Sequence, residues 1–327
     1  MSSRISFAPS HENPAASYHL IFLVTGNPGL ISYYDTFLRT LHELLSEKKS
    51  ETGVFHIFGQ SLAGFEDNDT PSKTTGLPHS LEGQIESRLQ CLEDQCIPSG
   101  PRQGQVYDSI ILVGHSVGGY IILEMLQRLR KSSRCNVKGG ILLFPTVTHI
   151  AKSPNGAKFS ALFRIWGFPR GASLAAKALL WPVPDPALRW LVHVVVGMPQ
   201  DATEVTMRFL RSRMGIWQAL HLAKDEMETI TEDKWDEDIW GIEHEDAGSV
   251  VDIPKLVFYF GENDHWVADH TRDALIASRG REEGKLSSKP IMLIDENGID
   301  HGFCIRHSES ESMAEKVKVW IDEIIHR

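Results

Sequence analysis

Hydrophobic residues follow two alternating patterns along the chain. Short, nearly continuous apolar runs of strand length occupy residues 18–25, 54–58, 110–113, 139–144, 255–260 and 291–294. Between these runs, apolar residues recur at helical spacing in a stretch that begins near Ser32 and over residues 81–92, 120–127 and 313–325. Buried strands that alternate with helices predict an α/β fold, with a mostly parallel central sheet and helices on both faces.

The alternation stops after Pro145 and resumes at Lys255. We therefore predict a core built from residues 1–148 and 251–327, with residues 149–250 inserted as a helical cap. A chain of 327 residues is long enough for a large α/β domain with such an insertion.

The predicted cap has two unlike halves. Residues 159–198 are hydrophobic at 25 of 40 positions, include Trp166, Trp181 and Trp190, and carry four basic residues against one acidic residue. Residues 225–246 contain eleven acidic residues and a single lysine. This composition fits a helical cap with a buried face, followed by a solvated acidic connection. It fits equally a monotopic element at a lipid surface, where tryptophans and basic flanks are common.

Overall composition limits the other partners and the compartment. A net charge of −10 argues against nucleic acid, because no basic stripe is available to neutralise phosphates. Residues 1–17 are polar and contain no secretory signal, so we expect a cytosolic start. The four cysteines lack C-x-x-C spacing and are expected to be reduced thiols that bind no metal: Cys91, Cys96, Cys135 and Cys304.

A candidate nucleophile lies between an apolar run and a helical pattern. Gly114-His115-Ser116-Val117-Gly118 matches the G-x-S-x-G nucleophile elbow, in which a serine at a strained turn projects its hydroxyl above the sheet. The two glycines are needed because side chains there would collide with neighbouring backbone. A serine in an ordinary glycine turn is the alternative, and the flanking strand and helix favour the elbow.

Serine becomes nucleophilic when a base takes its proton and an acid orients that base. Asp264 follows the predicted strand 255–260 at its carboxyl end, where open α/β sheets place their sites. Asp269 and Asp252 are alternatives, although Asp252 precedes the strand. His301 is the predicted base, because it lies in the loop after the next strand.

The oxyanion that forms during acyl transfer needs two hydrogen-bond donors already aimed at it. One predicted donor is the backbone N–H of Val117. The other is the backbone N–H of Asn27, in the loop after strand 18–25, where Gly29 lets the backbone approach closely. A simple turn at Asn27-Pro28-Gly29 is the alternative.

These segments together resemble the α/β-hydrolase superfamily and, more narrowly, the lipid-droplet-associated serine hydrolase family. The resemblance covers residues 20–320 and rests on Gly26-Asn27-Pro28-Gly29 with Tyr33-Tyr34, Gly114-His115-Ser116-Val117-Gly118, Gly261-Glu262-Asn263-Asp264-His265-Trp266, Asn297-Gly298-Ile299-Asp300-His301-Gly302-Phe303 and His221-Leu222-Ala223-Lys224-Asp225-Glu226-Met227. It implies that Ser116 is the nucleophile, Asp264 the acid and His301 the base. Thr25 departs from the superfamily, where many members have histidine before the oxyanion glycine.

The residues and the resemblance together predict a serine ester hydrolase that acts on lipid esters and needs no metal or organic cofactor. The resemblance implies a location at the lipid droplet surface, with the endoplasmic reticulum membrane as a further site. The sequence does not indicate the oligomeric state. The alternative is a droplet-surface protein that keeps the hydrolase fold but mainly binds lipid or a partner.

Overall fold

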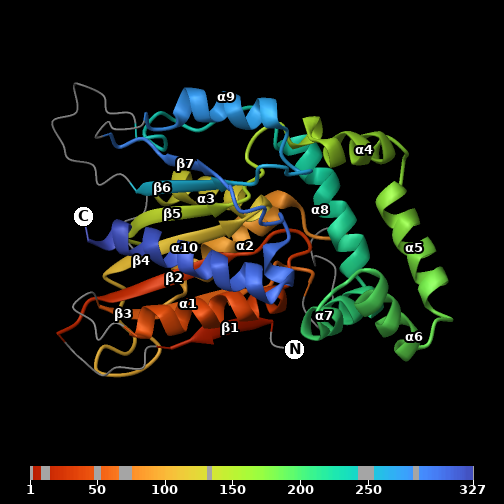
Figure 1. Cartoon of the computed structure of the whole chain (residues 1–327), viewed down its shortest axis with the longest axis horizontal. Coiled ribbons are helices and arrows are strands. Elements are labelled where there is room, and N and C mark those ends of the chain that lie inside the picture. Colours follow the sequence, from red (N-terminus) through yellow and green to blue (C-terminus); the bar gives the residue numbers. More distant parts are fainter. Residues whose placement is uncertain are drawn as a thin grey trace.

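The computed structural model describes residues 3–8, 15–47, 53–65, 76–130, 135–241, 254–282 and 287–326. Its centre is a seven-stranded sheet in the order β1-β3-β2-β4-β5-β6-β7 (Figure 1). All neighbouring strands are parallel except β1, which pairs antiparallel with β3. The strands are β1 (Arg4–Phe7), β2 (Tyr18–Val24), β3 (Val54–Gln60), β4 (Ser109–His115), β5 (Val137–Leu143), β6 (Lys255–Phe260) and β7 (Ile291–Ile294).

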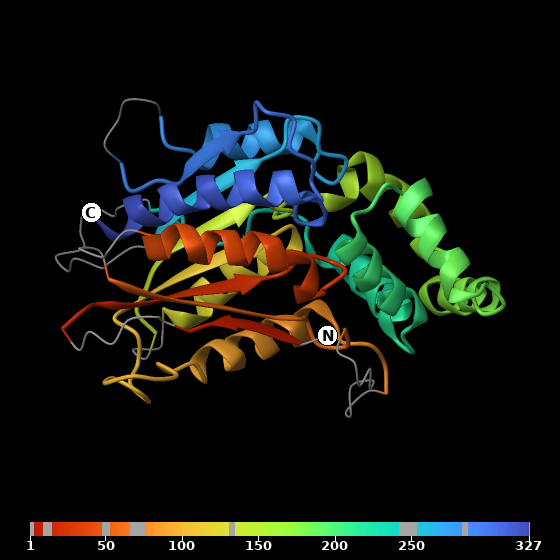
Figure 2. The same ribbon diagram turned by 60° about the horizontal axis from the view of Figure 1, so that its bottom comes forward.

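Two hydrophobic clusters lie on the opposite faces of this sheet. Strand β2 is buried throughout, and alternate side chains point to alternate faces. One face packs against α1 (Asp35–Glu47) and α10 (His307–Ile325), as Figures 1 and 2 show. The other face packs against α2 (Leu81–Glu93), α3 (Val117–Leu129) and α9 (Asp269–Arg279).

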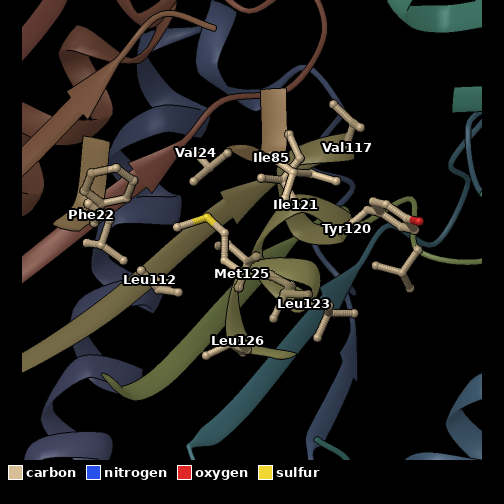
Figure 3. Close-up of a cluster of buried hydrophobic side chains, with 14 of the residues drawn as sticks. Phe22, Val24, Ile85, Leu112, Val117, Tyr120, Ile121, Leu123, Met125 and Leu126 are labelled. Atoms are coloured by element: carbon tan, nitrogen blue, oxygen red, sulfur yellow. The ribbon is translucent and has the colours of Figure 1, made fainter. Parts of the chain in front are cut away.

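Figure 3 shows the second cluster around α3. Phe22 and Val24 of β2 and Leu112 of β4 lie beside Ile121 and Met125 of α3. Because α3 is buried on nearly its whole surface, the turn that precedes it is held rigidly between sheet and helix.

The chain between β5 and β6 forms a group of helices at one end of the sheet (Figures 1 and 2). They are α4 (Pro154–Phe163), α5 (Phe168–Leu180), α6 (Asp185–Trp190), a π-helical turn at Leu191–Val195, α7 (Gln200–Arg211) and α8 (Gly215–Thr229). Helices α5 and α6 lie farthest from the sheet in both views. Short 3-10 turns occur at Ile31–Tyr34, Ile150–Lys152 and Phe303–Ile305.

The prediction of an α/β fold with a mostly parallel sheet is confirmed, and three local predictions need correction. The polar N-terminal segment contains the edge strand β1, which sequence analysis missed, and α9 was also missed. The acidic half of the insertion is not simply a solvated connection. As far as Gly241 it contains Glu226, Trp235 and Trp240, and all three are buried because α8 and the following turn pack onto the core. Residues 67–78 are rich in Asp, Thr, Ser and Pro, which predicts a loop, but they fall mostly outside the described residues.

Candidate active site

Ser116 lies at the turn between β4 and α3. Its backbone angles are φ 55° and ψ −122°, a combination that residues other than glycine rarely adopt. Two hydrogen bonds hold the turn: the Ser116 N–H donates to the Leu143 carbonyl over 3.0 Å, and the Gly119 N–H donates to the Ser116 carbonyl over 2.9 Å. The strained turn is therefore maintained by the strand on one side and the helix on the other.

The glycines around this turn stand where no side chain fits. A Cβ atom at Gly118 would lie 2.3 Å from the Val24 carbonyl oxygen, and one at Gly114 would lie 2.6 Å from the Gly118 carbonyl oxygen. At Gly26, a Cβ atom would approach the side chains of His115 and Ser116 to 3.0 and 3.1 Å. Close backbone packing thus brings the loop after β2 against the serine.

The three predicted catalytic side chains lie within hydrogen-bonding distance of one another. His301 Nε2 is 3.0 Å from Ser116 Oγ, and His301 Nδ1 is 2.7 Å from Asp264 Oδ2. The other carboxylate oxygen of Asp264 accepts the Trp266 backbone N–H over 2.8 Å. Asp264 is buried and orients the ring of His301, whose Nε2 then faces the serine hydroxyl.

Of the two alternative acids, Asp269 does not occupy this position. Asp269 begins α9, is exposed, and forms an ion pair with Arg272 at 3.0 Å. Together with His265 and His270, Asp269 lines a cavity of about 600 Å³ that is separate from the cavity at Ser116 described below. Asp252 lies outside the described residues.

His115 connects the loop that contains His301 to the loop after β2. Its Nε2 lies 2.8 Å from the His301 carbonyl oxygen, and its Nδ1 lies 2.6 Å from Tyr34 Oη. Because a carbonyl oxygen only accepts, Nε2 carries the hydrogen and Nδ1 accepts from Tyr34. Burial, followed by the charge of His301, lowers the pKa of His115 to about 3, so this imidazole is neutral. A neutral ring in one tautomer therefore holds the backbone of His301.

The loop after β2 also has its polar groups held from several directions. Tyr34 Oη accepts the Gly26 N–H over 3.0 Å, which links this loop to His115. The Asn27 side-chain amide donates to the Ala219 carbonyl oxygen over 3.0 Å and to Glu226 Oε1 over 2.9 Å. Thr25 Oγ1 is buried without a hydrogen-bond partner in the described part of the chain. Support for this loop thus comes from Tyr34 and α8 rather than from the Thr25 side chain.

Val117, on the opposite side of the serine, is the first residue of α3. Backbone N–H groups in the first turn of a helix have no partner within that helix. The positive end of the helix dipole also lies there. The Val117 N–H is therefore available to an anion that forms next to Ser116.

A cavity of about 400 Å³ opens onto Ser116. Its polar side is formed by Asn27, His301 and Glu226, whereas its apolar wall comes largely from the helices inserted between β5 and β6. The apolar lining residues are Ile150, Met198, Phe209, Leu210, Ala223, Trp266 and Ile305. A ligand with a long apolar portion and one reactive polar group matches this lining.

Sequence reasoning missed two buried carboxyl groups near the site. Asp295 accepts hydrogen bonds from Tyr259 Oη and from the Ile299 N–H, and so shapes the loop that leads to His301. Glu226 lines the cavity and is buried among the helices. Burial raises the pKa of Glu226 to about 8, although the hydrogen bond from Asn27 acts in the opposite direction. Its place within a strongly acidic segment concealed it, because exposed acids such as Glu228 and Glu232 lie close to it in the chain.

The predicted lipid-surface tryptophans are exposed. The exposed fractions of Trp166, Trp181 and Trp190 are 98, 86 and 60%. The described part of the chain has sixteen exposed large hydrophobic side chains, and eleven of them lie between residues 162 and 196. We call these eleven the outer apolar face: Leu162, Ile165, Trp166, Leu174, Leu179, Trp181, Trp190, Leu191, Val194, Val195 and Val196. Among the described residues, none of the helices combines the length and apolarity needed to cross a bilayer.

The fold and the strand–turn–helix that carries Ser116 define an α/β hydrolase. Solved structures with this fold include juvenile hormone epoxide hydrolase from the silkworm Bombyx mori, at a TM-score of 0.59 and 12% identity, with 98% of this chain and 73% of that chain covered. A second is the Rhodococcus hydrolase that acts on 2-hydroxy-6-oxo-6-phenylhexa-2,4-dienoate, at a TM-score of 0.56 and 14% identity, with 100% and 99% covered. At these identities the likeness establishes the fold alone.

The model of the lipid-droplet associated hydrolase family matches residues 17–304, and the chain belongs to that family. Similar relatives include the lipid droplet-associated hydrolases of Rattus norvegicus, 28% identical over 93% of this chain and 85% of that protein, and of Drosophila melanogaster, 25% identical over 91% and 88%. The family resemblance predicted from the motifs is thereby confirmed.

Proposed function

We propose that this protein is a serine hydrolase that cleaves lipid esters, of the acylglycerol or sterol-ester type, at the lipid droplet surface. The observation that carries the proposal is the hydrogen-bonded series from Ser116 through His301 to Asp264, which faces a mostly apolar cavity. Family membership supports a hydrolase, and the droplet location is taken from the name that the relatives carry.

In the first half of the proposed reaction, Ser116 Oγ attacks the ester carbonyl while His301 Nε2 takes the hydroxyl proton. Asp264 accepts a hydrogen bond from the N–H at His301 Nδ1 and stabilises the imidazolium that forms. The negative charge that develops on the carbonyl oxygen is held by the backbone N–H groups of Val117 and Asn27. Collapse of this intermediate expels the alcohol, which receives its proton from His301, and leaves Ser116 acylated.

In the second half, a water molecule gives a proton to His301 and its oxygen attacks the acyl carbon. The same two backbone N–H groups stabilise the second oxyanion. The carboxylic acid then leaves, and Ser116 Oγ recovers its proton from His301. All of these steps use groups of the chain and water.

We also propose that residues 149–250 form a cap between the two parts of the core, and that its outer apolar face contacts the lipid surface. Monomeric proteins rarely expose apolar areas that are large and continuous unless those areas bind something. Arg164, Arg170 and Lys177 lie in the same segment and would favour a surface that contains anionic phospholipids. The cap would thereby hold the cavity near its substrate.

The outer apolar face also favours a second candidate function. A protein with such a face could bind droplets or a partner as its main task and hydrolyse esters slowly or not at all. The arrangement of Ser116, His301 and Asp264 favours the first candidate, because a binding protein has no need for an oriented base.

Two measurements on the purified full-length chain test the proposal. Reaction with a fluorophosphonate probe reports whether Ser116 is activated, and turnover of emulsified acylglycerols and sterol esters reports the substrate class. We expect covalent labelling at Ser116 and hydrolysis of at least one emulsified ester. If the protein binds emulsions but neither reacts with the probe nor releases fatty acid, the second candidate replaces the first.

A further inference from the structure

Helix α8 contacts the predicted oxyanion loop through the buried carboxyl group of Glu226 and through one backbone carbonyl group. Glu226 Oε1 accepts one hydrogen of the Asn27 amide over 2.9 Å, across 199 positions of the sequence. The second hydrogen of the same amide goes to the carbonyl oxygen of Ala219 over 3.0 Å. Ala219 and Glu226 are seven residues apart, which is about two helical turns, so they lie on one face of α8.

These two contacts determine the orientation of the Asn27 amide. If the amide were rotated by half a turn, its carbonyl oxygen would face the Ala219 carbonyl oxygen, and two acceptors would be opposed. The amide nitrogen must therefore face α8. A side chain held in this way by two acceptors restricts the backbone from which it projects, and the Asn27 backbone N–H is the proposed second oxyanion donor.

Attachment of α8 to the core does not require Glu226. Asp225 accepts the Leu81 N–H over 2.6 Å, and the Gln218 side chain forms two hydrogen bonds to the backbone of His79, over 2.7 and 2.9 Å. A buried carboxyl group costs free energy that an apolar side chain at the same position would not cost. The specific consequence of having glutamate at position 226 is the directed contact with Asn27.

We propose that Glu226 is a positioning residue that sets the direction of the Asn27 N–H, so that cap helix α8 completes the geometry of the oxyanion hole. This inference rests on the proposed function, because it assigns Glu226 a part in acyl transfer at Ser116. Glu226 touches neither Ser116 nor His301 through a hydrogen bond and acts through Asn27.

The test uses the variants Glu226→Ala, Glu226→Gln and Asn27→Ala, the double variant of the two alanine changes, and Glu228→Ala as a control on the same helix. Glu228 is exposed and pairs with Lys224 at 2.9 Å. Glutamine keeps an acceptor for the Asn27 amide, whereas Asn27→Ala keeps the backbone N–H but removes its restraint. Hydrolysis of a soluble ester and inhibition by a trifluoromethyl ketone, whose adduct with serine carries an oxyanion, are measured for each.

We expect Glu226→Ala to lower kcat about 10- to 100-fold, as for a misplaced oxyanion donor, while KM changes by no more than a few-fold. Binding of the trifluoromethyl ketone should weaken by a similar factor. Glu226→Gln and Glu228→Ala should stay within a few-fold of the parent. The double variant should lose no more than the more damaged single variant, because both changes break one contact.

Unchanged kcat in Glu226→Ala would overturn the inference, and so would a loss confined to KM or a loss of equal size in Glu226→Gln. An NMR measurement separates this failure from failure of the proposed function, because it needs no activity. With asparagine labelled by ¹⁵N, the backbone amide signal of Asn27 should move in Glu226→Ala and stay near its parent position in Glu226→Gln. If the parent protein proves inactive, an unmoved signal in Glu226→Ala still rejects the positioning role.

Discussion

Tryptophan side chains have opposite surroundings in the buried core and on the outer apolar face. Trp235 and Trp240 are 4 and 0% exposed, and their indole N–H groups donate to Glu124 and Asp233, both over 3.1 Å. The tryptophans of the outer apolar face are 60 to 98% exposed. Both of these indoles therefore bury their apolar area while their N–H groups are paired, as folding alone requires. The outer face keeps apolar area in contact with solvent, which folding does not explain.

The same contrast separates two tasks. The groups around Ser116 are buried and held by hydrogen bonds from several elements, which suits chemistry that depends on fixed distances. The outer face lies on helices α4 to α6 and the π-helical turn, and it requires apolar contact rather than exact geometry. Changes in one region should consequently leave the task of the other region intact.

The sharpest test of this separation is Ser116→Ala. Removal of the nucleophile should lower esterase activity by up to about 10⁶-fold and abolish fluorophosphonate labelling. Binding to emulsions should equal that of the parent, because the outer apolar face is untouched. Activity assays, probe labelling and emulsion flotation check the three results. Substantial covalent labelling of the variant would remove Ser116 from its proposed role.

A smaller effect is expected from Asp264→Asn. The amide cannot hold His301 in the tautomer that accepts the serine proton, so kcat should fall on the order of 10⁴-fold. Asp269→Asn is the matched control and should stay within a few-fold, since Asp269 pairs with Arg272 and not with His301. Steady-state kinetics of both variants on one soluble ester shows which of the two aspartates is the acid. The reverse ranking would move the acid to Asp269.

The outer face is tested by replacing Trp181 and Trp190 with serine together. Loss of two apolar contacts worth roughly 1.5 kcal/mol each should weaken binding to emulsions or droplets about a hundredfold. Hydrolysis of a small soluble ester should be unchanged. Val106→Ser and Val319→Ser are matched controls, because both valines are exposed and lie outside the cap.

Quantitative flotation with emulsions of neutral lipid under a phospholipid monolayer measures this change. If the double variant binds as well as the parent while the valine controls do the same, the face does not anchor the protein. The proposed droplet location would then have lost its physical basis.

A smaller effect for each step of the measurement is expected at Glu226, and it depends on pH. The pKa of Glu226 is raised from 4.5 to about 8 by burial, so between these values the folded protein binds a proton that the unfolded chain has lost. The stability that Glu226 contributes must therefore fall as pH rises through this window, by up to roughly 1.4 kcal/mol per pH unit. Glu226→Gln removes this dependence.

Urea unfolding of the parent and of Glu226→Gln at pH 5, 6, 7 and 8 measures the difference. The free energy of unfolding of the variant, relative to the parent, should rise steadily with pH. Parallel curves for the two proteins would mean that Glu226 does not exchange its proton on unfolding in this range.

The sequence by itself determined the order of the core elements and the segments that meet at the site. Strands of continuous apolar residues and helices with one apolar stripe are local patterns, so the alternation that predicts a parallel sheet can be read without a structure. The same holds for the elbow at Ser116, whose glycines are neighbours in the chain. Asp264 and His301 were identifiable because each follows a predicted strand, and parallel strands end at one edge of the sheet.

Only the tertiary structure decided which polar groups are buried and what they contact. Edge strand β1 has only four residues, which alternate polar with apolar, and it is a strand because β3 offers a partner. Glu226 looks like the other acids of its segment until α8 places it against Asn27, and the link from Tyr34 to His115 joins positions 81 residues apart. The tryptophans between β5 and β6 likewise differ in burial according to the elements that pack beside them. Local sequence patterns do not predict such contacts, because burial and hydrogen bonding depend on residues that the chain brings together only when it folds.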